Sequence, residues 1–212
     1  MAARVRVYLE TGSKRVFASA ADWPGWSRGG KNEALALETL ATYAARYAPV
    51  ARLAGLTFDA RATEFDVVER MPGGASTDYG VPGTPARDEA GAPTAAQLKR
   101  MRSLLEAAWK YLDRARASAP ATLRKGPRGG GRDREPIYDH VLGAEVEYAK
   151  RIGLRLEQPP GGDAKAVNAF RKAILEGFHT SSPATKWPLA YFARRAAWHV
   201  LDHAWEIEDR IP

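Results

Sequence analysis

The chain has 212 residues, 45% of them hydrophobic and 27% charged, which favours one large folded domain or a small domain joined to a medium one and argues against wholesale disorder. It contains no cysteine, which excludes disulfides, thiolate metal ligands and a cysteine nucleophile, and it has no run of about 18 apolar residues that would cross a membrane. The net charge of +7 is compatible with nucleic-acid binding, but no nucleic-acid motif accompanies it, so solvated basic surface is the favoured interpretation and nucleic acid is not an expected partner.

Residues 1–70 predict a small α/β domain. Residues 4–10 alternate between polar and apolar side chains, and residues 15–20 form a second strand-like segment after a turn, which indicates a β-hairpin. An amphipathic pattern over residues 31–48 predicts a helix, and β-forming residues over 57–68 predict a further strand. The expected order is therefore ββαβ. Because the chain passes directly into strand-like alternation without an apolar signal core, we expect a cytoplasmic location.

The segment between the second strand and the helix reads as a loop. It runs from Asp22 to Gly30 and contains the stretch Trp23-Pro24-Gly25-Trp26 followed by a glycine-rich link into an alanine- and leucine-rich helix. This arrangement resembles that of HicB-like small α/β domains over about 45 residues. The resemblance implies an accessory or substrate-lid layer, and no nucleic-acid activity is carried over with it.

Residues 71–93 are rich in Gly, Pro, Asp and Thr, which is typical of a linker or surface excursion. A helix then begins: Thr94 and Gln97 have the spacing of a capping box, and an apolar stripe continues to about Ala117. We expect a second domain to start at this helix.

Residues 94–212 predict four helices. The second begins at Glu135-Pro136 and ends near Gly153, since proline suits a first turn and glycine a helix end. The third has Asp163 as its N-cap, and the fourth runs from Trp187-Pro188 to about Arg210. The predicted fold class is therefore α+β: a ββαβ layer followed by a four-helix bundle.

Three of the four histidines have a pattern that suits a metal ion. His199 and His203 are four residues apart on the last helix, so their side chains lie on one face. His140 lies on the core-facing stripe of the second helix of the predicted bundle. Three converging imidazoles can hold a divalent metal and leave a position open for water or substrate. Spacing alone leaves the alternative of satisfied core or surface histidines open. Val200 follows His199, so the glutamate of an HExxH metalloprotease is missing.

Two segments resemble the motifs of the DinB/YfiT-like superfamily. His140-Val-Leu-Gly-Ala-Glu145, followed by Tyr148, is similar to the second-helix motif of that family, and the segment from Arg194 to Glu206 is similar to its last-helix HxxxH motif. The resemblance covers about residues 94–210. It implies a four-helix bundle that binds one divalent metal, with zinc favoured and nickel or iron open, through His140, His199 and His203.

The resemblance also implies a reaction class. Characterised members include thiol-dependent transferases and isomerases that use low-molecular-weight thiols such as mycothiol or bacillithiol, although some of these isomerases have a carboxylate where this chain has His199. Because this chain lacks cysteine, any reactive thiol must come from a diffusible cosubstrate. A hydrolase acting on a small molecule is equally compatible with a metal that activates water.

Four further residues are candidates for the site. Arg195 lies one turn before His199 and could bind an anionic substrate group, and Glu206 lies one turn after His203 and could orient an imidazole or act as a base. Arg128 and Arg132 belong to a basic loop that could bind a charged cofactor or substrate. Plain solvation or surface ion pairs are the alternative for each arginine.

Two functions of different classes follow. The first is a metal-dependent enzyme, either a thiol-dependent transferase or isomerase or a hydrolase, that acts on a small molecule. The second is a non-catalytic, stress-related or antitoxin-like binding protein in which the metal site is structural. The sequence leaves a homodimer open in both cases.

Overall fold

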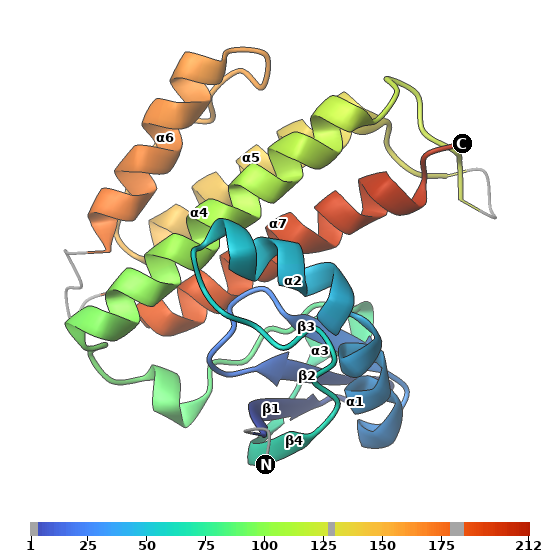
Figure 1. The fold of residues 1–212 in the computed structure, drawn as a ribbon. Helices are drawn as coiled ribbons and strands as arrows, with labels where there is room; N and C mark the ends of the chain where they lie inside the picture. Colours follow the sequence, from blue (N-terminus) through green and yellow to red (C-terminus); the bar gives the residue numbers. More distant parts are fainter. Residues whose placement is uncertain (1–3, 127–129, 179–184) are drawn as a thin grey trace.

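The computed structural model describes residues 4–126, 130–178 and 185–212. Within these ranges the chain combines a four-stranded sheet with seven α-helices, so the mixed α+β class is confirmed. Figure 1 shows the sheet and its two helices at one end and the longer helices at the other. One large hydrophobic core runs from the sheet into the long helices, and a small second cluster consists of Tyr8, Met71 and Ala86.

The sheet has the strand order β3-β2-β1-β4. The predicted hairpin is confirmed by β1 (Val5–Thr11) and β2 (Val16–Ala20), which pair antiparallel. Strand β4 (Phe65–Pro72) pairs parallel with β1, and β3 (Ser27–Gly30) pairs antiparallel with β2. The predicted strand at 57–68 is therefore displaced toward the C-terminus, and the sheet has one strand more than the predicted ββαβ layer.

The prediction of a loop over residues 22–30 was wrong at its end, where β3 forms. Glycine is what allows this strand to fit: a Cβ on Gly30 would lie 2.4 Å from the backbone nitrogen of Ala36, and one on Gly29 would lie 3.1 Å from the ring of Phe17. A composition typical of a loop thus serves close packing on both sides.

The predicted helix over 31–48 is also corrected, because it consists of α1 (Glu33–Thr42) and α2 (Ala44–Leu53). The indole nitrogen of Trp26 donates a 2.9 Å hydrogen bond to the carbonyl of Leu40, the group that the next helical amide would use. Tyr43, whose backbone amide donates to the carbonyls of Leu40 and Ala41, separates the two helices.

Both faces of the sheet are covered. Leu9 and Ala18 face the core shared with α1 and α2, whereas Tyr8, Glu10 and Phe17 face the opposite way. On that second face Phe17 makes an edge contact with Trp198 of the last helix, with ring centroids 6.1 Å apart. The sheet is therefore packed between its own helices and the last helix of the chain.

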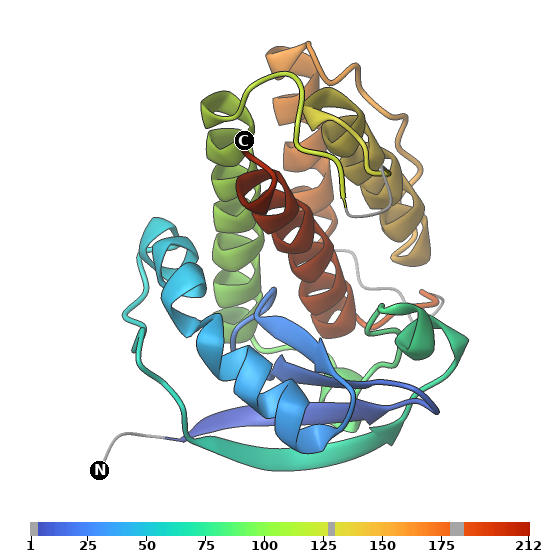
Figure 2. The ribbon, with the colours of Figure 1, turned by 90° about the vertical axis from the view of Figure 1, so that its right-hand side faces the viewer.

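The four long helices begin close to where the sequence predicts. They are α4 (Ala95–Ser118), α5 (Arg134–Arg151), α6 (Ala164–Gly177) and α7 (Leu189–Asp209). The capping box of Thr94 with Gln97 is present, and the Asp163 carboxylate accepts hydrogen bonds from two backbone amides of the first turn of α6. Figures 1 and 2 show the four helices side by side, with α7 also lying over the sheet.

The predicted linker at 71–93 is tightly held. It contains the end of β4, α3 (Ala75–Tyr79) and a short 3-10 helix (Arg87–Glu89). The buried carboxylate of Glu10 accepts hydrogen bonds from the Thr77 hydroxyl at 2.5 Å and from the amides of Gly83 and Thr84 at 3.0 Å. These contacts fix the segment to β1.

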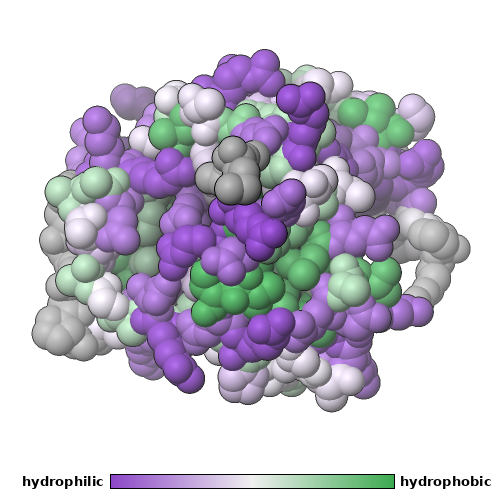
Figure 3. Space-filling model, turned by 60° about the horizontal axis from the view of Figure 1, so that its bottom comes forward, coloured by the Kyte–Doolittle hydropathy of each residue, from purple (hydrophilic) through white to green (hydrophobic). Residues whose placement is uncertain are grey.

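Hydrophilic side chains cover most of the surface at the sheet end. Figure 3 shows a hydrophobic patch near the centre of this face, bordered by hydrophilic residues, and smaller hydrophobic areas toward the edges. In the described part of the chain the exposed large hydrophobic residues are few: Leu35, Val68, Tyr79 and Ile211. Among the described helices, none has both the length and the apolarity needed to span a membrane.

Candidate metal centre

His140 of α5 and His199 and His203 of α7 lie together where these two helices pack. The ring centroids are 5.1 Å apart for His140 and His199, 4.9 Å for His140 and His203, and 4.6 Å for the pair on α7. One potential ligand atom from each residue lies within 4.8 Å of the other two. The structure therefore brings together the three histidines that the sequence singles out.

Burial favours the neutral form of His140 and His199, which is the form that binds a metal. His199 is only 8% exposed, and burial, followed by the positive charges of His203 and Arg195, holds its pKa well below 6.5. Burial also lowers the pKa of the half-buried His140, with His203 and Arg132 as further causes. The buried Nδ1 of His199 has no hydrogen-bond partner within the described residues.

Glu206 fixes the orientation of His203, as its sequence position predicts. Its Oε2 lies 2.7 Å from Nδ1 of His203, and its Oε1 accepts a 2.7 Å hydrogen bond from Arg210. Burial pushes the pKa of Glu206 upward, but the hydrogen bonds and charges of His203 and Arg210 outweigh it and lower that pKa. An ionised carboxylate at this place holds the proton on Nδ1 and leaves Nε2 of His203 free for a ligand.

The three predicted arginines are placed differently. Arg195 is buried, and its guanidinium stacks on Tyr148 and Trp198. Arg132 is exposed, and its charge acts on His140 and His199. Arg128 lies outside the described residues.

Two carboxylates near the motifs have other partners. Asp202 forms a 2.7 Å ion pair with Arg28, which also stacks on the ring of Trp205. Glu145 is buried and accepts a hydrogen bond from the indole of Trp109. Neither carboxylate therefore orients an imidazole. The contact of Arg28 with α7 has no signal in the sequence, since 174 residues separate the pair.

An aromatic wall adjoins the histidines. The ring of Tyr148 lies 5.7 Å from that of His199 and 5.3 Å from that of Trp187, and Trp187 in turn contacts Tyr191. Tyr148 could be anticipated, because it lies two turns after His140 on the same helix face. Trp187 could not, because it precedes α7 and its direction depends on the loop before that helix.

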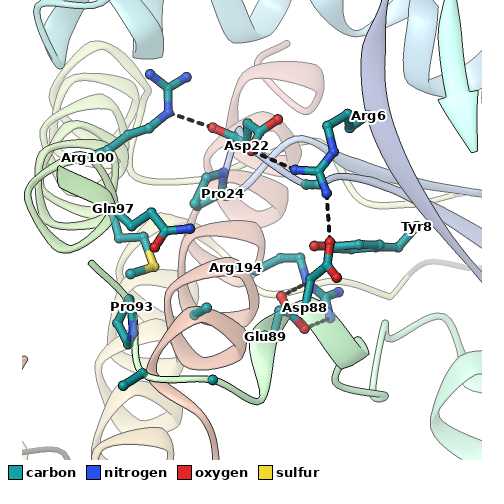
Figure 4. A pocket seen from close by; sticks show the side chains of 15 residues that line it. Arg6, Tyr8, Asp22, Pro24, Asp88, Glu89, Pro93, Gln97, Arg100 and Arg194 are labelled. Atoms are coloured by element: carbon teal, nitrogen blue, oxygen red, sulfur yellow. Dashed lines mark hydrogen bonds and ion pairs between the residues drawn. The ribbon is translucent and has the colours of Figure 1, made fainter. Parts of the chain in front are cut away.

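A separate pocket of about 370 Å³ lies between β1, α4 and α7 (Figure 4). Arg6 pairs with Asp22 and Asp88 at 3.4 and 2.6 Å, and Arg100 donates to the carbonyl of Asp22 at 2.8 Å. Each arginine that lines the pocket has an anionic or carbonyl partner: Arg6, Arg100 and Arg194. This pocket lies at the junction between the sheet and the long helices. The charges of its three arginines are balanced by the carboxylates of Asp22, Asp88 and Glu89.

The donor set at the histidines fits a divalent transition metal. Three neutral nitrogen ligands suit zinc, nickel or iron and leave coordination positions for other groups. His140 and His203 are half-buried, so such positions would be accessible from solvent. Comparison with protein-family models, curated protein sequences and solved structures finds no match for this chain.

Proposed function

We propose that the protein binds one divalent metal ion, with zinc favoured, through His140, His199 and His203. The observation that carries this proposal is the convergence of the three imidazoles, with one potential ligand atom of each within 4.8 Å of the others. The buried Nδ1 of His199 adds to it. A buried polar atom without a partner costs about 1–3 kcal/mol, and a ligand at the centre of the cluster would remove part of that cost.

We further propose that residues 94–210 form a DinB-like four-helix bundle and that the protein is a metal-dependent enzyme acting on a small molecule. Support comes from the order of the four long helices and from the positions of the three histidines on the second and the last of them. Transfer, isomerisation and hydrolysis are all compatible with this site. A thiol-dependent reaction would need a diffusible thiol such as mycothiol, because the chain has no cysteine.

When bound, a divalent metal at such a site supplies Lewis acidity, which lowers the pKa of a thiol or water ligand. The protein's own residues prepare for this. Glu206 holds the proton on Nδ1 of His203 and so keeps the other nitrogen available. Tyr148 and Trp187 shield one side of the cluster from water. Arg132 contributes positive charge near His140 and favours an anionic substrate.

The alternative, a non-catalytic antitoxin-like protein with a structural metal, predicts a closed site. Structural zinc sites have all four positions filled by protein ligands. Here only three ligand residues converge within the described part of the chain, and two of them are half-buried. The open position favours a reactive site.

Metal analysis of protein purified without a histidine tag tests the site directly. Zn²⁺, Ni²⁺ or Fe²⁺ is added to metal-free protein, and stoichiometry and affinity are measured by calorimetry and elemental analysis. We expect about one ion per chain for the wild type and none at the same metal concentration for His199→Ala. His179→Ala is the control variant, since His179 is the one histidine of the chain that is not among the three proposed ligands. Wild-type protein that takes up no metal would show the proposal to be wrong.

Chelation separates the enzyme from the structural alternative. Removal of a structural metal unfolds or strongly destabilises a protein, whereas removal of a catalytic one leaves the fold largely intact. We expect the metal-free protein to remain folded, because the hydrophobic core surrounding the site is continuous. A screen of thermal stability with metal and then with small thiols would identify the cosubstrate, since ligands of the folded state raise the melting temperature.

A further inference from the structure

Arg195 is a buried arginine without an ionic partner. Arg195 is 7% exposed. Within the described residues its guanidinium makes no hydrogen bond and no ion pair. Of the carboxylates, Glu10 has the largest electrostatic effect on Arg195, and that carboxylate already accepts hydrogen bonds from Thr77, Gly83 and Thr84. The residues outside the described ranges include no Asp or Glu, so they hold no side-chain carboxylate that could pair with Arg195.

Aromatic rings surround the guanidinium in place of an anion. Its Cζ lies 4.9 Å from the ring centroid of Tyr148 and 4.6 Å from that of Trp198. Stacking of this kind stabilises a cation by about 0.5–2 kcal/mol, which is less than the several kcal/mol that burial of a charge costs. The positive charge is therefore incompletely compensated in the protein alone.

The uncompensated charge adjoins the histidine cluster. Arg195 lies one turn before His199 on α7, and Tyr148 contacts both, since its ring centroid is also 5.7 Å from that of His199. The other cation near the cluster on α7, Arg210, already pairs with Glu206. The guanidinium of Arg195 is thus a buried cation beside the histidines, bordered by aromatic rings, whereas Arg132, which also acts on His140 and His199, is exposed to solvent.

We propose that Arg195 binds the carboxylate of the substrate, and that the substrate is a small monocarboxylate with an apolar or aromatic body. A guanidinium matches a planar carboxylate with two parallel hydrogen bonds. A single buried cation among aromatic rings suits a monoanion better than a phosphate dianion, which needs more positive charge to leave water. This inference rests on the proposed function, because it names the substrate class of the same site.

Benzoate and its uncharged isostere benzamide are the probes. Their binding to metal-loaded and to metal-free protein is measured by calorimetry, and the tryptophan fluorescence, to which Trp198 beside the guanidinium contributes, gives a second readout. We expect benzoate to bind the wild type and benzamide to bind at least about tenfold more weakly, the effect of losing one charge-assisted hydrogen bond. Arg195→Gln should lose benzoate binding by a similar factor. Arg195→Lys, which keeps the charge but not the planar fork, should bind at an intermediate level.

Arg100→Gln is the matched control, since Arg100 also stacks on a tryptophan, Trp23, but lines the separate pocket and has a carbonyl partner. It should bind benzoate as the wild type does. Equal benzoate affinity in wild type and Arg195→Gln, or no benzoate binding by folded wild type in either metal state, would overturn the inference. Metal content is measured in the same samples. Arg195-dependent binding of benzoate by protein that takes up no metal would uphold the carboxylate site and refute the metal proposal alone.

Discussion

The two sides of α7 differ in how their polar groups are satisfied. Toward the sheet, Arg194 donates to both carboxylate oxygens of Glu89 at 2.6 and 2.8 Å and to the carbonyl of Thr84 at 2.9 Å, which leaves only its Nη1 without a partner. Toward α5, the neighbouring Arg195 has no hydrogen bond within the described residues, and Nδ1 of His199 has none either. Two consecutive residues of α7 thus lie in different environments: Arg194 is paired with an anion and Arg195 is not.

This contrast distinguishes buried polar groups that stabilise the fold from buried polar groups that remain available to a ligand. A buried group that is fully paired contributes to a unique structure, whereas a buried group without a partner lowers stability by about 1–3 kcal/mol and persists where it has another use. The paired side fixes the sheet and the predicted linker against α7. On the other side, Nδ1 of His199 and Nη1 of Arg195 are buried without a partner among the described residues.

The largest effect is expected from breaking the paired side. Glu89→Gln leaves the charge of Arg194 buried without its anion, so the free energy of unfolding should fall by about 3–5 kcal/mol. Urea unfolding at pH 7 measures this. Asp88→Asn removes the half-exposed partner of Arg6 one residue earlier and should cost less than about 1 kcal/mol. If the free energy of unfolding falls by the same small amount in both variants, the ion pair between Glu89 and Arg194 does not fix α7 against the sheet.

These contacts also show which features of the fold could be predicted from the sequence. The capping box at Thr94, the N-cap at Asp163 and the hairpin strands depend on neighbours in the chain, and their predictions are confirmed. The pair Glu89 and Arg194 joins residues 105 apart, and no local pattern marks it. The predicted linker was therefore judged by its composition alone, and its anchoring to β1 and α7 was not anticipated.

The candidate site was easier to predict than the fold around it. The spacing of His199 and His203 and the apolar stripe that carries His140 are periodic features of single helices, so their convergence required only that α5 and α7 pack together. Strand β3 was missed for the opposite reason. Its glycines are chosen by contacts with Phe17 and Ala36 across the fold.

Glu145 is only partly paired: the indole of Trp109 donates to one of its carboxylate oxygens, and the other oxygen has no partner among the described residues. Burial raises its pKa from 4.5 to about 7. The folded state then binds a proton that the unfolded state releases, so stability should fall by about 3 kcal/mol as the pH rises from 4.5 to 7. Glu145→Gln should remove this loss and be more stable than wild type at pH 8 but not at pH 4. Urea midpoints across this pH range test it, with the exposed Glu147→Gln as the control that should show no such gap.

Glu206→Gln tests the side of α7 that carries the histidines. A neutral amide cannot stabilise the proton on Nδ1 of His203 as a carboxylate does, so metal affinity should fall about 10- to 100-fold with little change in the stability of the metal-free protein. Competition with a chelating dye measures the affinity. Glu208→Gln, two residues further along α7 and paired with Arg46, should bind metal as the wild type does. Unchanged affinity in Glu206→Gln would place Glu206 outside the metal site.

The smallest effect is expected at Arg195, and it tests the comparison most directly. Arg195→Met keeps an unbranched, flexible side chain and removes a buried charge that has no anion, so the gain in desolvation offsets the loss of stacking on Tyr148 and Trp198. The free energy of unfolding should stay within about 1 kcal/mol of wild type or rise, whereas Arg194→Met should lose several kcal/mol because it leaves Glu89 buried and unpaired. Thermal and urea unfolding of the two metal-free variants, side by side, measure the contrast. An equal loss at both positions would mean that Arg195 supports the fold as Arg194 does, and the difference between the two sides of α7 would then not mark a binding site.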